Sequence, residues 1–284
     1  MKKITLYIFV VVSFINLISC DEMHMLEIEH YNKQVYLVGS GEEGSKLPRE
    51  ISYTIADTVI FASIGVSGSL AADQNAHVVL EENPSEIEVY NQKYKSITDI
   101  QYQPLPASNY EISSYEAIVG KGEISALVPI KINPEGLHCD SLYAIPLTIK
   151  SCDVYPVVDS KSIVLLAIST FNDYSNNYNY AGQKDGISFS LLRTATAVDS
   201  RTIRIYNSGS EDLKNVDNEG LKIHVNPDNS LSFEGWKNMN IISGSGTYMP
   251  DNQQFLMEFV YKDAADSQHT VEASLTVASL EEDE

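Results

Sequence analysis

The stretch SLYAIPLTIK, residues 141–150, has the composition of one extended strand, rich in aromatic and branched apolar residues. It separates two cysteines, Cys139 and Cys152. Ten residues at about 3.3 Å each hold the strand's ends roughly 30 Å apart, whereas a disulfide needs Cα atoms within about 7 Å. We therefore expect two free thiols, although two cysteines in an exported chain leave a disulfide open as the alternative.

Similar short apolar segments with alternating side chains, separated by turn residues, precede and follow this strand. Only residues 83–97 suggest a helix, because Ile87, Tyr90 and Tyr94 fall at helical spacing behind Asn83-Pro84. We predict that residues 34–168 form an antiparallel β-sandwich with one short helix. The other strand segments are QVYLVG (34–39), TVIFASIGVSG (58–68), AHVVLEEN (76–83), SALVPIKI (125–132) and SIVLLAIS (162–169).

The composition changes at STFNDYSNNYNYAGQKDG, residues 169–186, where tyrosine, asparagine and glycine replace the aliphatic residues. We place a domain boundary near Ser169. About seven further strand segments follow in sequence order, which predicts a second antiparallel β-domain over residues 169–284, either a sandwich or an up-and-down barrel. The clearest hairpin is HVNPDNSLSF, residues 224–233, in which four turn-forming residues separate two alternating runs.

The first 20 residues have the parts of a secretory signal. Lys2 and Lys3 precede an apolar run that ends at Cys20 and gives way at once to Asp21 and Glu22. The run is shorter than the roughly 20 apolar residues that a membrane-spanning helix needs. The sequence Leu-Ile-Ser-Cys at 17–20 resembles the lipobox of bacterial lipoproteins. The resemblance implies a signal peptide over residues 1–19, a lipid on Cys20, and a tether over residues 20–33.

Removing the signal leaves a strongly acidic chain. Residues 1–20 hold two of the 19 cationic side chains and none of the 39 acidic ones, so 17 cations face 39 acids, a net charge of −22. This charge repels nucleic-acid phosphate and anionic headgroups, which excludes nucleic acid as a partner. The lipid, rather than the protein surface, is expected to hold the chain to a membrane.

Several strand patterns resemble those of Sus-type outer-membrane lipoproteins. IGVSGSLAADQNAHVVLE (64–81) and AIVGKGEISALVPIKI (117–132) resemble their N-terminal immunoglobulin-like domain of unknown function, and GSGTYMPDNQQFLMEFVYKD (244–263) resembles their C-terminal β-domain. The resemblance implies an all-β chain with an immunoglobulin-like antiparallel sandwich first. It also implies a lipid-anchored protein of the outer membrane, facing the cell exterior. The implied partners are a polysaccharide or oligosaccharide, a TonB-dependent transporter and a SusD-like lipoprotein.

No pattern in the sequence supports catalysis. The family 18 glycosidases that carry the same immunoglobulin-like domain space their acids as DGxDxDxE, whereas DGISFSLL at 185–192 has serines at Ser188 and Ser190. The six histidines are scattered singly, so His224 is expected to be an ordinary strand residue. We expect no enzyme, no catalytic residues and no cofactor.

Two loops gather oxygen donors suited to a hard cation, NVDNEG at 215–220 and NPDNS at 226–230. The regular spacing of a calcium-binding loop is absent, and Asp and Asn also build ordinary turns. We therefore assign no metal site.

Aromatic residues among amides and carboxylates indicate sugar binding, because a sugar ring has an apolar face and a rim of hydroxyls. One cluster lies before the second domain's strands, and the other surrounds the only tryptophan. The alternatives are that the tyrosines line the hinge between the domains and that the tryptophan is a core residue. The candidate glycan-binding residues are Tyr174, Asn176, Asn177, Tyr178 and Tyr180, and Trp236, Tyr248, Asp251 and Asn252.

The sequence thus predicts a lipid-anchored surface protein that captures a polysaccharide for a Sus-type uptake system, with the first domain as a spacer. One rival is a structural or adhesive surface lipoprotein without sugar affinity. The other is a glycoside hydrolase with an unrecognised carboxylate pair.

Overall fold

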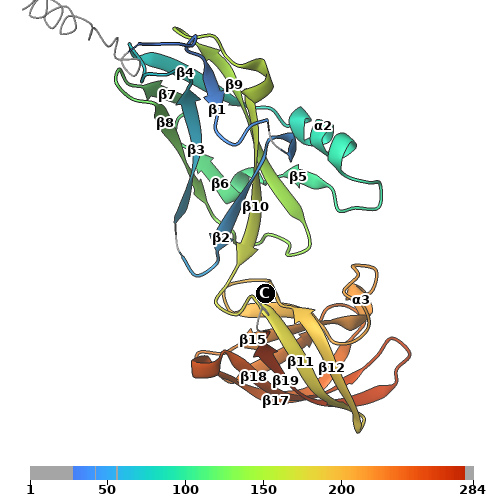
Figure 1. The fold of residues 1–284 in the computed structure, drawn as a ribbon. Coiled ribbons are helices and arrows are strands. Elements are labelled where there is room, and N and C mark those ends of the chain that lie inside the picture. Colours follow the sequence, from blue (N-terminus) through green and yellow to red (C-terminus); the bar gives the residue numbers. More distant parts are fainter. Residues whose placement is uncertain (1–27, 42, 56, 279–284) are drawn as a thin grey trace, which may run out of the picture.

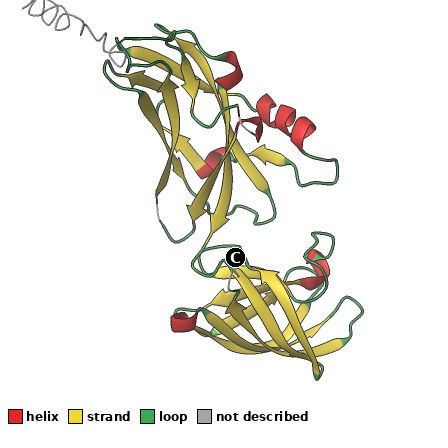
Figure 2. Cartoon of the chain, viewed as in Figure 1, coloured by secondary structure: helices red, strands yellow, loops and turns green. Residues whose placement is uncertain are grey.

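The computed structural model describes residues 28–278 except residues 42 and 56. It shows an all-β chain of two domains stacked end to end, which confirms the predicted fold class (Figures 1 and 2). The predicted signal peptide, Cys20 and most of the tether lie outside the described residues. Within the described residues, no helix has the length and apolar character needed to cross a membrane.

The first domain consists of strands and one α-helix with short 3-10 turns between them. The helix α2 (Ser85–Tyr94) forms where the sequence predicts it and buries Ile87 and Tyr90. The strands are β1 (Val35–Leu37), β2 (Lys46–Ser52), β3 (Thr58–Val66), β4 (Ala76–Glu82), β5 (Tyr102–Pro104), β6 (Tyr110–Ile112), β7 (Glu116–Val119), β8 (Ser125–Ile132), β9 (Leu142–Cys152) and β10 (Ile163–Phe171); the 3-10 turns are η2 (Glu43–Ser45), η3 (Ala107–Asn109) and η4 (Asp159–Lys161).

These strands form a sandwich of two sheets. A four-stranded sheet has the order β1-β3-β8-β6, and a six-stranded sheet has the order β2-β10-β9-β4-β7 with β5 beside β9. Most neighbours are antiparallel, but β2 runs parallel to β10 and β5 parallel to β9. Alternate residues of the strands fill the space between the sheets, as in β8, where Val128, Ile130 and Ile132 are buried between exposed neighbours.

The strand that separates the two cysteines is β9, which includes residues 142–150 of the predicted extended stretch. Its last residue is Cys152, while Cys139 precedes its first residue in the loop after β8. Both thiols are free, so the prediction of two unpaired cysteines is confirmed.

The second domain begins after β10 and contains a run of antiparallel strands. Its elements are β11 (Asn177–Lys184), β12 (Ile187–Thr194), β13 (Thr196–Ala197), β14 (Thr202–Tyr206), α3 (Val216–Glu219), β15 (Gly220–Val225), β16 (Leu231–Gly235), β17 (Asn240–Met249), η5 (Pro250–Asn252), β18 (Gln254–Lys262) and β19 (Gln268–Val277).

Successive strands of this domain are neighbours in an up-and-down order. A five-stranded sheet has the order β12-β11-β19-β18-β17, and a four-stranded sheet has the order β13-β14-β15-β16. A single bridge between Ser230 and Thr247 joins the two sheets at one corner. Aromatic side chains dominate the core between them, with Phe255, Phe259 and Tyr261 of β18 almost fully buried.

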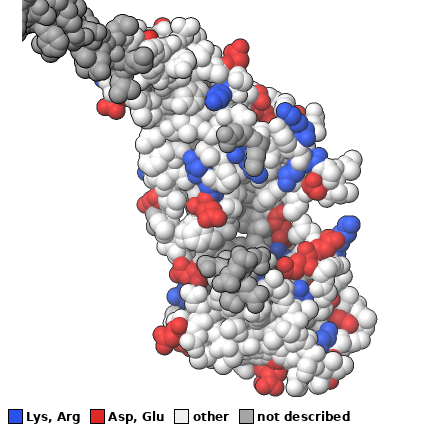
Figure 3. Space-filling model, viewed as in Figure 1, with Lys and Arg blue, Asp and Glu red and all other residues white. Residues whose placement is uncertain are grey.

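The link between the domains is the short turn from Asn172 to Asn176. The boundary predicted near Ser169 therefore falls inside β10, which still pairs with β2 and β9 of the first domain. On the face drawn in Figure 3, acidic and basic groups of the described residues are interspersed over both domains and form no continuous basic patch.

Candidate functional site

The predicted tyrosine cluster does not form a ligand surface. Tyr178 and Tyr180 point to the inner side of β11 and are 1% and 0% exposed. The hydroxyl of Tyr178 donates to the carbonyl oxygen of Tyr174 at 2.9 Å, and burial raises the pKa of both buried phenols. Neither ring can stack on a sugar, so this part of the site prediction is wrong. The reason is strand alternation, which turns the tyrosines inward and Asn177 and Asn179 outward.

One aromatic residue from each of the two predicted clusters contacts the other. Tyr174 packs edge-to-face on Tyr248, with ring centroids 5.0 Å apart at 88°. Tyr248 is 7% exposed, and both rings close one end of the second domain's core. They therefore act as core residues rather than as a platform for a sugar ring.

The polar residues predicted beside these rings lie on turns and edges. Asn176 accepts from the backbone N–H of Asn177 through Oδ1, and Asn177 accepts from the Thr194 hydroxyl at 3.1 Å. Asp251 and Asn252 are exposed in the 3-10 turn η5.

Trp236 lies at the junction of the two domains. Its ring meets the edge of His138 from the first domain, with centroids 5.6 Å apart at 86°. The Arg204 guanidinium lies 5.5 Å from the ring centroid and the Lys222 ammonium 5.3 Å. The tryptophan is half-buried. It is therefore neither a buried core residue nor a fully exposed ring for stacking on a sugar, the two roles that the sequence suggested.

An ion pair accompanies this aromatic contact. Arg204 on β14 is 4% exposed and donates through Nη2 to Asp140, which precedes β9 in the first domain. The neighbouring Cys139 thiol has a raised pKa because burial and the Asp140 carboxylate both disfavour the thiolate. The group His138, Cys139 and Asp140 brings possible metal-ligating atoms within 4.8 Å of one another, but Asp140 is already paired with a guanidinium. A cation does not fit beside Arg204.

The donor-rich loop at residues 226–230 forms a hairpin turn, and residues 216–219 form the short helix α3. Asp228 accepts from the backbone N–H and the hydroxyl of Ser230 at 3.1 and 2.7 Å, and these bonds lower the pKa of its carboxyl group. Asn226 uses its side-chain amide to donate to Ser230 and Ser232. These bonds help to close the hairpin.

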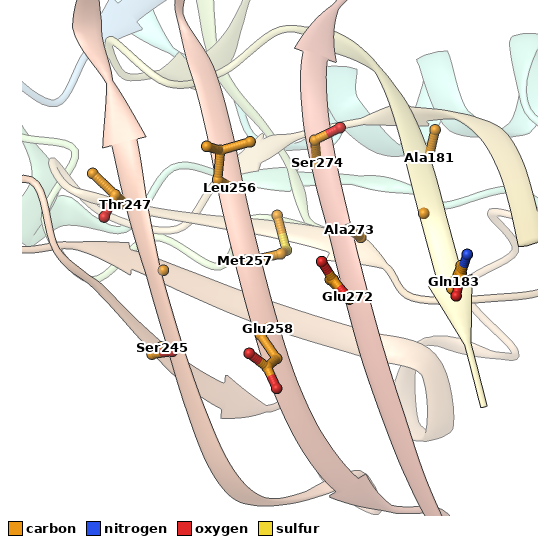
Figure 4. Close-up of a pocket in the computed structure, with 12 residues that line it drawn as sticks. Ala181, Gln183, Ser245, Thr247, Leu256, Met257, Glu258, Glu272, Ala273 and Ser274 are labelled. Atoms are coloured by element: carbon orange, nitrogen blue, oxygen red, sulfur yellow. The ribbon is translucent and has the colours of Figure 1, made fainter. Parts of the chain in front are cut away.

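The structure presents a different polar surface, on the outer face of the five-stranded sheet. A groove of about 620 Å³ crosses four of its strands, β11, β19, β18 and β17 (Figure 4). We call it the sheet groove. Three cross-strand rows line it: Ala181, Ser274, Leu256 and Thr247; Gly182, Ala273, Met257 and Gly246; and Gln183, Glu272, Glu258 and Ser245.

Two carboxylates lie side by side in the groove. Glu258 and Glu272 are direct cross-strand partners of β18 and β19, and both are exposed. Among the described residues, no lysine, arginine or histidine pairs with either of them. Like charges in directly opposite positions destabilise a sheet. The outer face of this sheet therefore presents two carboxylates that form no ion pair with a described residue.

The two glycines of the middle row, Gly182 and Gly246, are required for a steric reason. A methyl group on Gly182 would lie 2.1 Å from the carbonyl oxygen of Glu272 and 2.6 Å from the Cα of Ala273. A methyl group on Gly246 would lie 2.5 Å from the carbonyl oxygen of Leu256. Neighbouring backbones approach closely along this row, so a larger residue at either glycine would force the strands to shift.

This groove was not predicted from the sequence. A signal was present, since the apolar runs QQFLMEFVY and TVEASLTV each carry one glutamate at an alternating position. The pattern does not give the register in which the strands pair. That register places Glu258 opposite Glu272 and extends their cross-strand row to Gln183 and Ser245. Chemically, the groove offers carboxylate, amide and hydroxyl groups beside one exposed apolar side chain, that of Leu256. This set suits a neutral ligand rich in hydroxyl groups.

Comparisons with known proteins agree with the two-domain architecture. Residues 31–156 match a family model described as an N-terminal domain, and residues 162–276 match one described as C-terminal. No curated protein matches the chain.

Solved structures from Bacteroides share the fold. A protein of unknown function from Bacteroides ovatus has a TM-score of 0.66 and 16% identity, covering 89% of this chain and 98% of that one. A multidomain protein including DUF1735 from the same species has a TM-score of 0.63 and 18% identity, with coverages of 86% and 94%. An auxiliary nutrient binding protein from Bacteroides thetaiotaomicron has a TM-score of 0.57 and 14% identity, with coverages of 82% and 90%. The chain has the two-domain fold of these proteins.

Proposed function

We propose that this protein binds a neutral polysaccharide or oligosaccharide at the cell surface, in the sheet groove of its second domain. The observation that carries the proposal is the unpaired carboxylate pair, Glu258 and Glu272, within a groove of about 620 Å³. Sugar hydroxyls donate hydrogen bonds to carboxylates, and hydrogen bonds to charged groups are about twice as strong as neutral ones. Gln183, Ser245 and Thr247 add further hydrogen-bonding groups along the same face.

The charge of the site limits the ligand class. Two adjacent carboxylates in a chain with a net charge near −22 after signal removal repel uronic acids and sulfated sugars. The exposed side chain of Leu256 offers an apolar contact for a sugar's C–H face. The similarity in fold to an auxiliary nutrient binding protein supports a role in nutrient capture.

A binding experiment with the soluble chain from Asp21 onward tests the proposal. We expect retention on a gel of at least one neutral polysaccharide, with polygalacturonate as the anionic comparison. Replacing both Glu258 and Glu272 by glutamine removes the charged acceptors, so the dissociation constant should rise roughly tenfold or more. The variant should not be less stable, because the change relieves a like-charge contact.

The matched control is Glu116→Gln, which alters an exposed strand carboxylate of the first domain. It should bind as the unaltered chain does. If no neutral glycan is retained, the structural or adhesive alternative replaces sugar binding. If the double variant binds with unchanged affinity, the groove is not the site.

The anchoring part of the proposal concerns Cys20. We propose that a lipid on Cys20 holds the protein on the outer membrane, facing the cell exterior, where it assists a Sus-type transporter and its SusD-like partner. Two or three acyl chains anchor a protein stably, at about 0.8 kcal/mol for each buried methylene. The acidic chain supplies no attraction of its own to anionic lipid.

Cys20→Ala should therefore move the protein out of the detergent-rich phase of whole-cell extracts. Protease added to intact cells should cleave the unaltered protein. A Cys20→Ala variant that still partitions with the membrane would refute lipid anchoring, and protection from protease would place the protein on the periplasmic side.

One observation favours a second function. Glycosidases use two carboxylates that flank the scissile bond, and Glu258 and Glu272 are two carboxylates in directly opposite positions of neighbouring strands. A retaining mechanism would use one as nucleophile and the other as acid and then base. Both residues are exposed on an open sheet face, which is a poor setting for a carboxyl group that must stay protonated. Release of reducing ends from the retained glycan, lost in Glu258→Gln, would establish hydrolysis in place of binding alone.

A further inference from the structure

The α2–β5 loop, residues 95–101, presents apolar side chains to solvent. Ile97 is 99% exposed, the highest value for a large apolar side chain among the described residues, and Ile100 is exposed as well. On the adjoining helix, Val89 and Tyr94 are also exposed. Single exposed apolar residues are common, whereas several close together indicate a contact surface. In Figure 1, α2 and this loop project from one side of the first domain.

Hydrogen bonds hold the α2–β5 loop in shape. The Asp99 carboxylate accepts from the backbone N–H of Ser96 at 2.7 Å, and the Asp99 N–H donates to the Ser96 carbonyl oxygen at 3.1 Å. The side-chain amide of Gln101 donates to the same carbonyl oxygen at 2.9 Å. At the end of the loop, the Asn91 side chain donates to and accepts from the backbone of Tyr102, at 2.8 and 2.9 Å. These bonds keep the apolar tip of the loop in solvent rather than against the domain's core.

Aromatic rings and lysines surround the base of the loop. The Lys93 ammonium lies 5.0 Å from the ring centroid of Tyr94, and the Lys95 ammonium lies 5.3 Å from that of Tyr102. Tyrosine is enriched where proteins cross the boundary between water and a bilayer, and lysine ammonium groups pair with lipid phosphates there. An apolar tip above such a belt is suited to a membrane interface.

The helix separates its charges along its length. Glu86 and Glu88 lie in the first turn of α2, whereas Lys93 lies in the last turn and Lys95 caps the helix next to the loop. The carboxyl group of Asp99 has a lowered pKa, because of its bonds to Ser96 and then because of the charge of Lys95. The loop end of the helix therefore holds positive charge beside its one carboxylate, although the chain as a whole is acidic.

The lipid proposed for Cys20 keeps a bilayer within reach of this domain. The Glu29 carboxylate is fastened to the domain, because it accepts from the backbone N–H groups of Ser69 at 2.7 Å and Leu70 at 3.2 Å and pairs with Lys33. Residues 21–29 span at most about 32 Å, at 3.6 Å for each residue. The attachment point at Glu29 therefore stays within this distance of the lipid.

We propose that the α2–β5 loop inserts Ile97 and Ile100 into the headgroup layer of the membrane that anchors the chain, with Lys93 and Lys95 beside lipid phosphates. This inference rests on the lipid anchor proposed for Cys20. One loop is too small to hold an acidic chain on a membrane, so it orients the anchored domain rather than anchoring it. The first domain then sets the direction in which the sheet groove faces, which is a role beyond that of a spacer.

Quenching of tryptophan fluorescence by brominated lipid tests the proposal. The purified lipidated chain is placed in vesicles of phosphatidylethanolamine and phosphatidylcholine with brominated acyl chains, and the signal of Trp236 is subtracted by means of the unaltered chain. We expect quenching of the added tryptophan in Ile97→Trp. The matched control is Ile187→Trp, because Ile187 is a highly exposed isoleucine on β12 of the second domain. This control should not be quenched.

A second reporter shows that the natural tip drives insertion. The tryptophan of Tyr94→Trp should be quenched, and adding Ile97→Asp should remove the quenching, because a charge resists transfer into the apolar layer. Adding Leu127→Asp instead should leave it unchanged, since Leu127 is exposed on β8 in the other sheet.

Flotation of the vesicles separates the two ways in which the test can fail. If the chain floats with the vesicles and neither reporter is quenched, the loop is free for water or a protein partner, and the proposal is overturned while the anchor stands. Quenching of Tyr94→Trp that persists with Ile97→Asp also overturns it. If the unaltered chain does not float, the anchor at Cys20 fails and this proposal fails with it.

Discussion

At the scale of single residues, His269 joins two turns of the second domain. Its Nδ1 lies 2.7 Å from an Asp185 carboxylate oxygen in the turn after β11, and its Nε2 lies 3.2 Å from Asp263 in the turn after β18. The bond to Asp185, and then that to Asp263, raises the pKa of His269 above its ordinary value of 6.5, although burial and Lys184 act in the opposite direction. The bond to His269 lowers the pKa of Asp185, and the backbone N–H of Ser267, followed by the bond to His269, lowers the pKa of Asp263.

This arrangement predicts a stability that depends on pH. A histidine with a raised folded pKa stabilises the fold fully below its unfolded pKa, near 6.5, and this contribution is lost as pH rises through the folded value. The difference in unfolding free energy between the unaltered chain and His269→Gln should be larger at pH 5.5 than at pH 8.5 in urea titrations. The control is His77→Gln, because His77 is exposed on β4 and its ring has no partner among the described residues. An equal difference at both pH values would contradict the charged contact.

The same scale explains why the predicted sugar-binding tyrosines are structural. Tyr178 and Tyr180 stand two residues apart on β11, so both face the same side of the sheet. The side that they face is the core, where Tyr180 packs edge-to-face on Phe189 at 4.8 Å. Composition identified a cluster of rings, but a ring inside a core cannot stack on a ligand.

At the scale of elements, the pairing of β11 with β19 depends on close backbone contact at Gly182. Gly182→Ala places a methyl group 2.1 Å from the Glu272 carbonyl oxygen, which neither strand can avoid by a side-chain rotation. Overpacking of this kind costs about 1 to 3 kcal/mol of unfolding free energy, and the backbone contact places this site at the upper end. Chemical denaturation measures the change.

Gly120→Ala is the control for this substitution. A methyl group there would meet only the Cγ of Glu123, at an ordinary 3.5 Å, and Gly120 does not adopt a positive φ. It should change stability by well under 1 kcal/mol. If the two variants unfold alike, the close approach of β11 to β19 is not a constraint on the fold.

At the scale of the whole molecule, the contact between Arg204 and Asp140 couples the domains. Both side chains are largely buried, at 4% and 12% exposure, and Trp236 and His138 pack beside them. Removing one partner of a buried ion pair leaves an uncompensated charge and costs about 3 to 5 kcal/mol. The two domains therefore gain stability from one another at this junction.

Asp140→Ala should accordingly lower the unfolding free energy and separate the calorimetric melting of the two domains into distinct transitions. Asp140→Leu combined with Arg204→Met should recover most of the loss, because two apolar groups leave no unpaired charge. Asp159→Ala, an exposed residue of the first domain, is the control. A single, unshifted transition for Asp140→Ala would show that the domains are not coupled through this pair.

The sequence by itself determined the features that depend on local pattern. Apolar segments specified β1, β3, β4, β8, β9 and β10 of the first domain, but not β2, β5, β6 and β7. The spacing of Ile87 and Tyr90 behind Pro84 specified α2, and the length of β9 kept Cys139 from Cys152. Each of these follows from residues close together in the chain.

The tertiary structure alone decided which residues face a ligand. Strand alternation has a period of two, so it separates two faces without saying which one is covered. Pairing between distant strands buried Tyr178 and Tyr180, brought Glu258 opposite Glu272, and placed Trp236 against His138 of the other domain. These contacts join residues far apart in the chain, and their register depends on the packing of the whole domain rather than on any local stretch.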